Sequence, residues 1–169
     1  VRDLRIEVEE DALLVEQPQY GLSLNITDSR WMQVCIRVPK VWEKKLHVFT
    51  IGGLLNARGL TGSRVVLDTV SGDIRAQRIA SQELSLKTIS GDVRSDALTA
   101  ESITVRTVSG NITLDEAASQ TYKGTTVSGE LKMKLNRSFT TMDLRSVSGD
   151  VVVLAPVQRM NVSMRSLNG

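Results

Sequence analysis

A glycine that returns at a nearly constant interval limits the fold of this 169-residue chain more than any other feature of its sequence. The repeated residues are Gly53, Gly72, Gly91, Gly110, Gly129, Gly149 and Gly169, at four intervals of 19 residues followed by two of 20. A fixed period is typical of solenoids and related arrays, in which each copy is one structural unit stacked on the next. The repeat therefore predicts a stack of similar coils.

Two further columns precede the repeated glycine. The hydroxyl column, three residues before it, comprises Thr50, Thr69, Thr88, Thr107, Thr126, Ser146 and Ser166. The aliphatic column, two residues before it, comprises Ile51, Val70, Ile89, Val108, Val127, Val147 and Leu167. Apolar residues seven and five positions before the glycine share the parity of the hydroxyl column, which indicates a strand. The aliphatic column departs from that parity, so we expect a bend there and a corner with φ > 0 at the glycine.

Each copy is therefore expected to form one coil of two or three short strands. We predict an all-β, single-domain β-solenoid over residues 1–169, with repeat coils at 46–169 and an N-terminal β cap at 1–45. The usual strand twist favours a right-handed, β-helix-like stack, in which neighbouring coils lie roughly 4.8 Å apart. A β-sandwich is disfavoured, since its turns recur about every 8–12 residues without fixed columns.

Residues 1–45 lie outside the repeat but alternate as strands do. Three alternating apolar runs stand there: Leu4, Ile6 and Val8; Leu22, Leu24 and Ile26; and Met32, Val34, Ile36 and Val38. Cys35, the single cysteine, is expected to lie on the last of these strands and to face away from the core. Within the repeat, the fifth copy is expected to have the weakest core, with Gly124 at a strand position and Asn136 where Leu or Ile is expected.

The corner sequences resemble a known bacterial family. The segments TVSGDI, TISGDV, TVSGNI, TVSGEL and SVSGDV, preceded by VCIRVPK, are similar to the toastrack family of adhesin-like β-strand repeats. The resemblance covers residues 31–169 well and the first 30 residues loosely. It implies a stack of short strands, often attached to a membrane segment and linked to envelope-stress signalling. It implies no catalytic residues. The first copy departs from the pattern, with Gly52-Gly53-Leu54 in place of Ser-Gly-Asp.

Candidate chemistry is sparse. Residues Asp73, Asp92, Asn111, Glu130 and Asp150 follow the repeated glycines, and capping of the turn explains them better than a calcium ladder, which needs more oxygen ligands per coil. His47 is the only histidine, and serines at five corners do not single out a nucleophile. A net charge of +2 argues against a nucleic-acid partner. We expect no enzymatic activity, no metal site and no cofactor.

Basic residues at outward positions form two stripes. The first comprises Lys87, Arg106, Arg145 and Arg165, four residues before the glycine and interrupted by Thr125. The second comprises Arg75, Arg94 and Lys132, three residues after it. Such stripes fit a solvated face, and they also fit contact with anionic lipid, cell-wall polymer or an acidic partner.

These observations favour a non-catalytic interaction or scaffold module of the bacterial cell envelope, membrane-associated or extracytoplasmic, with a cytoplasmic location left open. The partner would be an unidentified protein or envelope component, and segments outside this chain could supply membrane attachment. The alternative is a structural β-solenoid that self-associates through its coil ends, as bactofilin-like polymers do. Because the last coil ends in an apolar strand at Gly169, we expect the natural protein to continue or another chain to cover this end.

Overall fold

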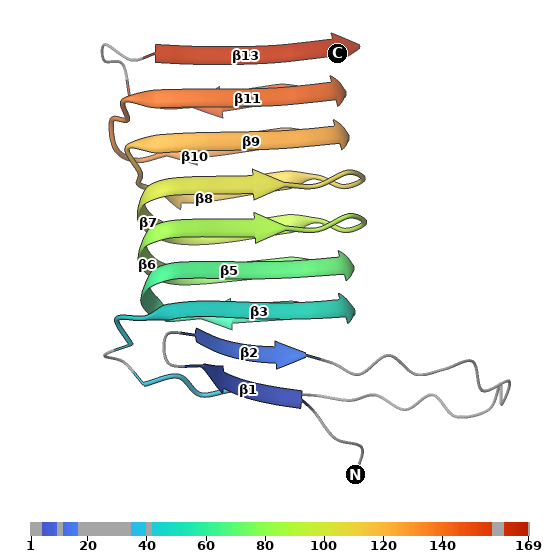
Figure 1. Ribbon diagram of the computed structural model, residues 1–169. Coiled ribbons are helices and arrows are strands. Elements are labelled where there is room, and N and C mark those ends of the chain that lie inside the picture. The colour runs from blue at the N-terminus through green and yellow to red at the C-terminus, as the bar shows by residue number, and fades with distance from the viewer. Residues whose placement is uncertain (1–4, 10–11, 17–34, 40–41, 157–160, 169) are drawn as a thin grey trace, which may run out of the picture.

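A computed structural model describes residues 5–9, 12–16, 35–39, 42–156 and 161–168, and every regular element in these segments is a β-strand. The predicted β-solenoid is confirmed. The chain winds between two parallel sheets, called here the front wall and the rear wall (Figure 1). The front wall contains β3 (Lys45–Gly52), β5 (Thr61–Ser71), β9 (Thr121–Ser128), β11 (Thr141–Ser148) and β13 (Asn161–Asn168). The rear wall contains β4 (Leu55–Arg58), β8 (Ile112–Ala117), β10 (Leu131–Leu135) and β12 (Val151–Leu154).

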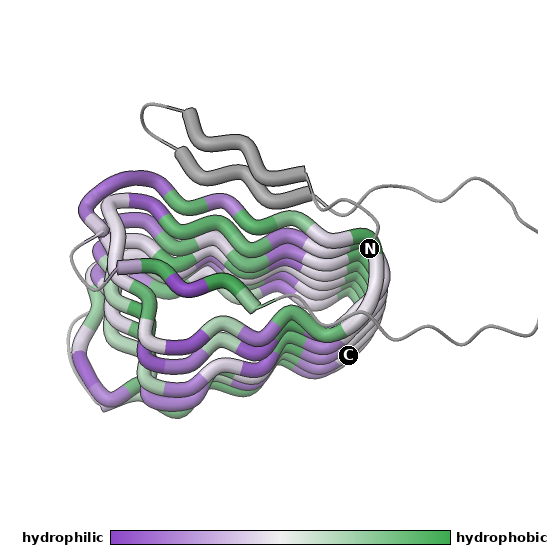
Figure 2. Tube along the Cα trace, turned by 90° about the horizontal axis from the view of Figure 1, so that it is seen from below, coloured by the Kyte–Doolittle hydropathy of each residue, from purple (hydrophilic) through white to green (hydrophobic). Residues whose placement is uncertain are grey.

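Two long strands, β6 (Ile74–Lys87) and β7 (Val93–Arg106), run through both walls and turn at their middle. Their first halves pair with the rear wall and their second halves with the front wall. The register follows the sequence period, because Leu84 pairs with Ile103 in the 19-residue part and Leu144 with Met164 in the 20-residue part. Viewed along the stack, successive coils superimpose as flattened loops (Figure 2).

Alternate residues of both walls fill the space between them. The fully buried side chains include Leu67, Ile74, Leu86, Val93, Leu98, Ile103, Leu131 and Leu144. Burial of each such side chain contributes roughly 1.5–3 kcal/mol. A single coil supplies only one strand to each wall, so its apolar side chains would stay open to solvent above and below. Stacking therefore supplies the burial, and the columns of the sequence are the columns of the core.

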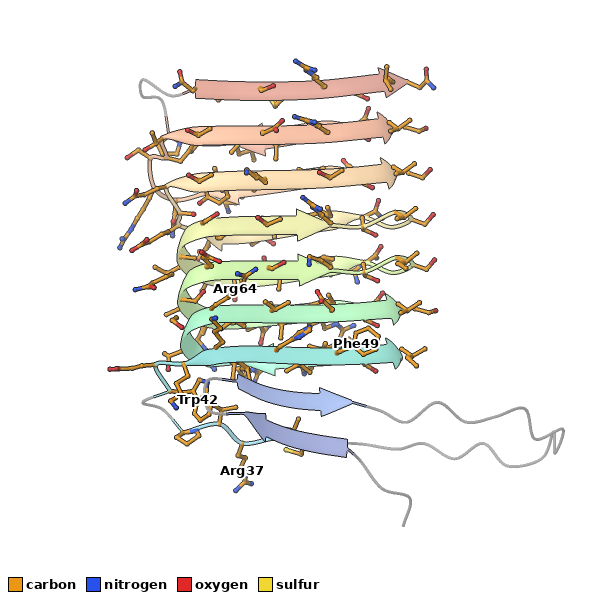
Figure 3. All side chains as sticks on the ribbon, viewed as in Figure 1. Arg37, Trp42, Phe49 and Arg64 are labelled. Atoms are coloured by element: carbon orange, nitrogen blue, oxygen red, sulfur yellow. The ribbon has the colours of Figure 1, made fainter. Side chains whose placement is uncertain are left out.

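The N-terminal strands extend the front wall. β1 (Arg5–Glu9) pairs antiparallel with β2 (Ala12–Glu16), and β2 pairs parallel with β3. The side chains of Val38 and Trp42 pack against the core at this end of the stack (Figure 3). These contacts fit the capping role expected for residues 1–45.

The expected strand around Cys35 is wrong, because residues 35–39 carry no strand hydrogen bonding. Cys35 is an exposed free thiol, and Ile36, expected in the core, is 37% exposed. Without a neighbouring strand in register, strand parity does not decide which side chain is buried. The expectations for Leu4, Met32 and Val34, and for the run from Leu22 to Ile26, lie outside the described residues.

The core of the fifth coil is continuous, which corrects the expected weak point. A register shift between Lys134 and Leu135 places Leu135 opposite Ala117, so Leu135 is buried and Asn136 is exposed. At this point β10 has no residue opposite Glu116, which moves the core position back by one, and the extra length of the coil lies between Leu135 and Thr141. At Gly124 the space of a missing side chain is filled by Leu131 and Leu144, whose methyl carbons would lie 2.8 Å from a Cβ there.

Candidate interaction surface

The repeated glycines form the edge of the stack where the chain passes from the front wall to the rear wall, called here the glycine corner. Gly91 has a φ of 150°, and a Cβ added there would lie 2.1 Å from the carbonyl oxygen of Gly72. Gly72 has no positive φ, yet its Cβ would lie 1.9 Å from the carbonyl oxygen of Gly53. The close approach of successive coils therefore requires glycine even where φ does not.

The column that follows the glycines holds neighbouring coils in register. The backbone N–H of Asp92 donates to Oδ1 of Asp73 at 2.9 Å, and the N–H of Asn111 donates to Oδ1 of Asp92 at 2.9 Å. The N–H of Glu130 donates to Oδ1 of Asn111 at 2.8 Å. Because the amide of Asn111 does the same work as a carboxylate, the column needs an acceptor and not a charge. No group of three or more metal-ligating side chains occurs among the described residues.

The hydroxyl column forms a second ladder just inside the corner. The hydroxyl of Thr88 donates to the carbonyl oxygen of Gly72 at 3.1 Å, and that of Thr107 donates to the carbonyl oxygen of Gly91 at 3.3 Å. Both threonines are buried. These two coils are therefore tied to their predecessors through the glycine carbonyl, whereas the buried hydroxyls of Thr69 and Ser146 have no hydrogen-bond partner among the described residues.

The first basic stripe lies on the outer surface of the front wall and is called here the basic column. Strand register places Lys87 directly beside Arg106, and Arg145 directly beside Arg165, with Thr125 between the two pairs. All four basic side chains are exposed. Like charges that stand directly opposite one another in a sheet are destabilising. The basic column thus brings together the four residues predicted from the sequence.

Three carboxylates of the front wall lie beside basic or histidine side chains, one of which, Arg145, belongs to the basic column. Asp143 bridges Arg145 at 2.8 Å, Glu83 bridges Arg64 at 3.2 Å, and Asp68 lies 3.1 Å from His47. In the part of the chain that the structure describes, Lys87, Arg106 and Arg165 form no ion pair. Three of the four basic residues of the column therefore form no ion pair with a described residue, although Asp68 occupies the same column and stands beside Lys87.

The second basic stripe, on the outer surface of the rear wall, is largely neutralised within each coil. Nη2 of Arg94 lies 2.7 Å from Oδ2 of Asp92, and Nζ of Lys132 lies 2.8 Å from Oε2 of Glu130. Each pair joins a basic residue to the acid two positions before it, on the same strand face. The two stripes look alike in sequence but differ in net charge, because the front wall has no corresponding column of acids.

The aliphatic column is half-buried at Ile51 and Val70 and exposed from Ile89 onward, which corrects the expected break in parity. Lys87 is exposed, Thr88 is buried and Ile89 is exposed again, so strand alternation continues to the corner. The exposed fraction is 51% for Ile89, 46% for Val108 and 41% for both Val127 and Val147. Sequence reasoning used this column only to locate the bend. Counting parity outward from Lys87 would have placed it on the surface.

A family model described as Toastrack DUF4097 matches residues 8–169. The chain belongs to the toastrack family. The match begins earlier than the resemblance at residue 31, so the toastrack domain includes β2 and the segment that leads into β3. No curated protein and no solved structure matches the chain.

Groups that could perform chemistry in the toastrack domain lie apart. His47 contacts Asp68 on the outer face of the front wall, whereas Cys35 is exposed near the N-terminal end. Burial raises the pKa of the Tyr122 phenol to about 12, and its ring packs edge-on against Phe139 at 5.6 Å, so this tyrosine serves the core. The described residues contain no helix long and apolar enough to cross a membrane.

Proposed function

We propose that this toastrack domain is a non-catalytic interaction module of the bacterial cell envelope, and that it binds an anionic component through the basic column. The observation that supports the proposal is the stacking of Lys87 on Arg106, neither of which forms an ion pair with a described residue, although Asp68 stands beside Lys87 on its other side. At the far end of the front wall Arg165 likewise forms no ion pair with a described residue and stands beside Arg145, which Asp143 bridges.

The electrostatics of a stacked column favour a ligand with repeated negative charge. Adjacent coils lie roughly 4.8 Å apart, within the screening length of about 8 Å at physiological ionic strength, so the stacked charges repel one another. A row of phosphates or carboxylates would relieve this repulsion along the whole column. Near an anionic membrane each basic residue contributes about 1 kcal/mol, so several in a row bind weakly but measurably.

Co-sedimentation with anionic vesicles and with cell-wall fragments tests the proposal. The front-wall variant replaces Lys87, Arg106 and Arg165 with Gln, and the matched rear-wall variant replaces Arg75, Arg94 and Lys132 with Gln. Both lose three positive charges, but the three of the front wall form no ion pair with a described residue, whereas Arg94 and Lys132 of the rear wall are each paired with an acid. We expect the parent to sediment with at least one ligand at low salt and to be released at high salt. The front-wall variant should bind at least about tenfold more weakly, and the rear-wall variant close to the parent.

Equal losses of binding in the two variants would contradict the role of the basic column. Binding would then depend only on the net charge of the chain. Sedimentation of the front-wall variant at the parent level would contradict it as well. Circular dichroism of each variant checks that the solenoid is intact.

Self-association through the end of the stack is a second candidate, favoured by the last strand. Val162 and Met164 of β13 are 42% and 52% exposed, although their register partners Met142 and Leu144 are buried. Apolar side chains and an open strand edge can accept another β-strand. The antiparallel β1–β2 pair at the other end opposes a continuous head-to-tail polymer. Light scattering that rises with concentration would support self-association, and a constant monomer mass would contradict it.

A further inference from the structure

The aliphatic column beside the basic column identifies the class of ligand more closely. Ile89 follows Lys87 on the same face of the chain, and Val108 follows Arg106 in the same way. The separation along the strand is roughly 6.6 Å for two residues. An exposed apolar row therefore runs parallel to an exposed basic row along the edge of the front wall.

The aliphatic residues are held in a continuous row by backbone hydrogen bonds. The N–H of Ser90 donates to the carbonyl oxygen of Val70 at 2.9 Å, and the N–H of Ser109 donates to that of Ile89 at 2.9 Å. The N–H of Ser128 continues the series to Val108 at 2.9 Å. Each coil thus presents its aliphatic side chain directly above the last, and the exposed part of the row, from Ile89 to Leu167, spans roughly 19 Å over four coil steps.

A fully solvated surface does not account for this row. Most other outward positions of the front wall are polar, such as Ser85 and Thr104, although Val66 occupies the equivalent position in the second coil. Contiguous apolar surface on a soluble protein marks a contact with another protein or with a membrane. The neighbouring charges favour a membrane, since an apolar face bordered by Lys and Arg is the pattern of interfacial binding to anionic lipid.

The charges on the two sides of the corner fix the orientation. The basic column lies on the front side of the aliphatic column, whereas Asp73, Asp92 and Glu130 lie on the rear side, beyond the glycine. Contact through the front side brings the basic residues to the lipid phosphates and keeps the rear-side carboxylates away from them, so that Asp68 and Asp143 are the acids nearest to the basic column. The first coil differs from the others. Phe49 stands there at the position of the basic column (Figure 3), and the exposed Leu54 stands at the position that holds an acid in later coils, so the apolar row is wider in this coil.

We propose that the aliphatic and basic columns together form a lipid-binding ridge, whose ligand is the surface of an anionic bilayer. The aliphatic side chains enter the boundary between headgroups and acyl chains, and the basic side chains contact the phosphates. This inference rests on the proposed function and narrows its ligand from any anionic envelope component to lipid.

Binding to three ligands separates lipid from polymer. The probes are phosphatidylglycerol vesicles, phosphatidylcholine vesicles and soluble polyphosphate. The aliphatic variant replaces Ile89, Val108, Val127 and Val147 with Thr, which keeps β-branching and backbone pairing. We expect it to bind phosphatidylglycerol vesicles at least about tenfold more weakly than the parent, but to bind polyphosphate equally. The front-wall Gln variant should lose both ligands, and neutral vesicles should bind none of the proteins.

Vesicle binding by the aliphatic variant at the parent level would overturn the lipid-binding ridge and leave a polyanion as the ligand, with the proposed function intact. Absence of all binding by the parent would overturn both. A site-specific probe gives an independent reading. In a Cys35→Ser background, a polarity-sensitive fluorophore on Val127→Cys should shift to the blue with phosphatidylglycerol vesicles, whereas one on Thr113→Cys, on the rear wall, should not. No shift at position 127, or equal shifts at both, would overturn the ridge.

Discussion

Each coil turns twice, and the two turns obey different rules. At the glycine corner every coil carries glycine. At the opposite edge, the residue six positions after the glycine has a left-handed backbone in four successive coils: Gly59 with φ 64°, Arg78 with φ 51°, Ala97 with φ 53° and Glu116 with φ 51°. This second corner, the left-handed corner, imposes no residue type. A fixed corner and a variable corner therefore alternate along the same chain.

The difference lies in what surrounds the backbone. A Cβ at Gly91 would meet the carbonyl oxygen of the preceding coil, which cannot move without breaking the stack. A Cβ at Gly59 would meet no atom within 4 Å. The left-handed conformation costs a non-glycine residue only roughly 1–2 kcal/mol, a cost that a stacked core can offset. Contact between coils is thus a stricter constraint than backbone conformation.

The largest expected effect comes from adding one methyl group at each corner. Gly91→Ala forces a Cβ against the carbonyl oxygen of Gly72 and adds left-handed strain, so we expect a loss of roughly 3 kcal/mol or more. Gly59→Ala adds only the strain, roughly 1–2 kcal/mol. Urea denaturation measures both. Equal losses would show that contact between coils adds nothing to the backbone cost.

The same contrast explains how much of the fold could be predicted from sequence. The glycine corner leaves a strict column, because a steric clash excludes all other residues, and that column predicted the solenoid and its register. The left-handed corner leaves none, since Arg78, Ala97 and Glu116 share only a backbone angle. The shift at Leu135 was also invisible, because a coil that is longer overall can still lack one residue at a corner, here the counterpart of Glu116.

The sequence also predicted the candidate site only in part, because fixed spacing shows which residues stack but not which of them are paired or exposed. Fixed spacing indicated that Lys87 and Arg106 would stack, and the register places them side by side. Spacing alone did not show that Arg94 forms an ion pair and Lys87 does not. Pairing depends on an acid two positions earlier, and only Arg94 has one there. The exposure of the aliphatic column was missed because its apolar residues were assumed to face the core, which required a bend in the chain. The proposed ridge lies beside the glycine corner, so the most constrained backbone of the molecule sets the spacing of its side chains.

A smaller effect is expected from the acceptor ladder, which belongs to the glycine corner alone. Asp92→Ala leaves the backbone N–H of Asn111 without its acceptor, and we expect a loss of about 1 kcal/mol. Asp92→Asn keeps an oxygen in place, as Asn111 does for Glu130, and should remain within about 0.5 kcal/mol of the parent. Thermal and urea unfolding measure both variants. An equal loss for Asn and Ala would indicate that the charge of Asp92, which also pairs with Arg94, matters here and not the acceptor.

The smallest effect is a gain in stability at the left-handed corner. Ala97 holds φ at 53°, where glycine is free of strain, and the first coil carries Gly59 at the equivalent position. Ala97→Gly removes roughly 1–2 kcal/mol of strain but adds roughly 0.5–1 kcal/mol of chain entropy in the unfolded state. We therefore expect a net gain of about 0.5–1 kcal/mol, seen as a higher urea midpoint with an unchanged slope. This substitution is the reverse of Gly59→Ala at the same corner. If Ala97→Gly instead destabilised the domain, the methyl group of Ala97 would contribute packing that outweighs its strain, and the left-handed corner would be constrained by contacts as the glycine corner is.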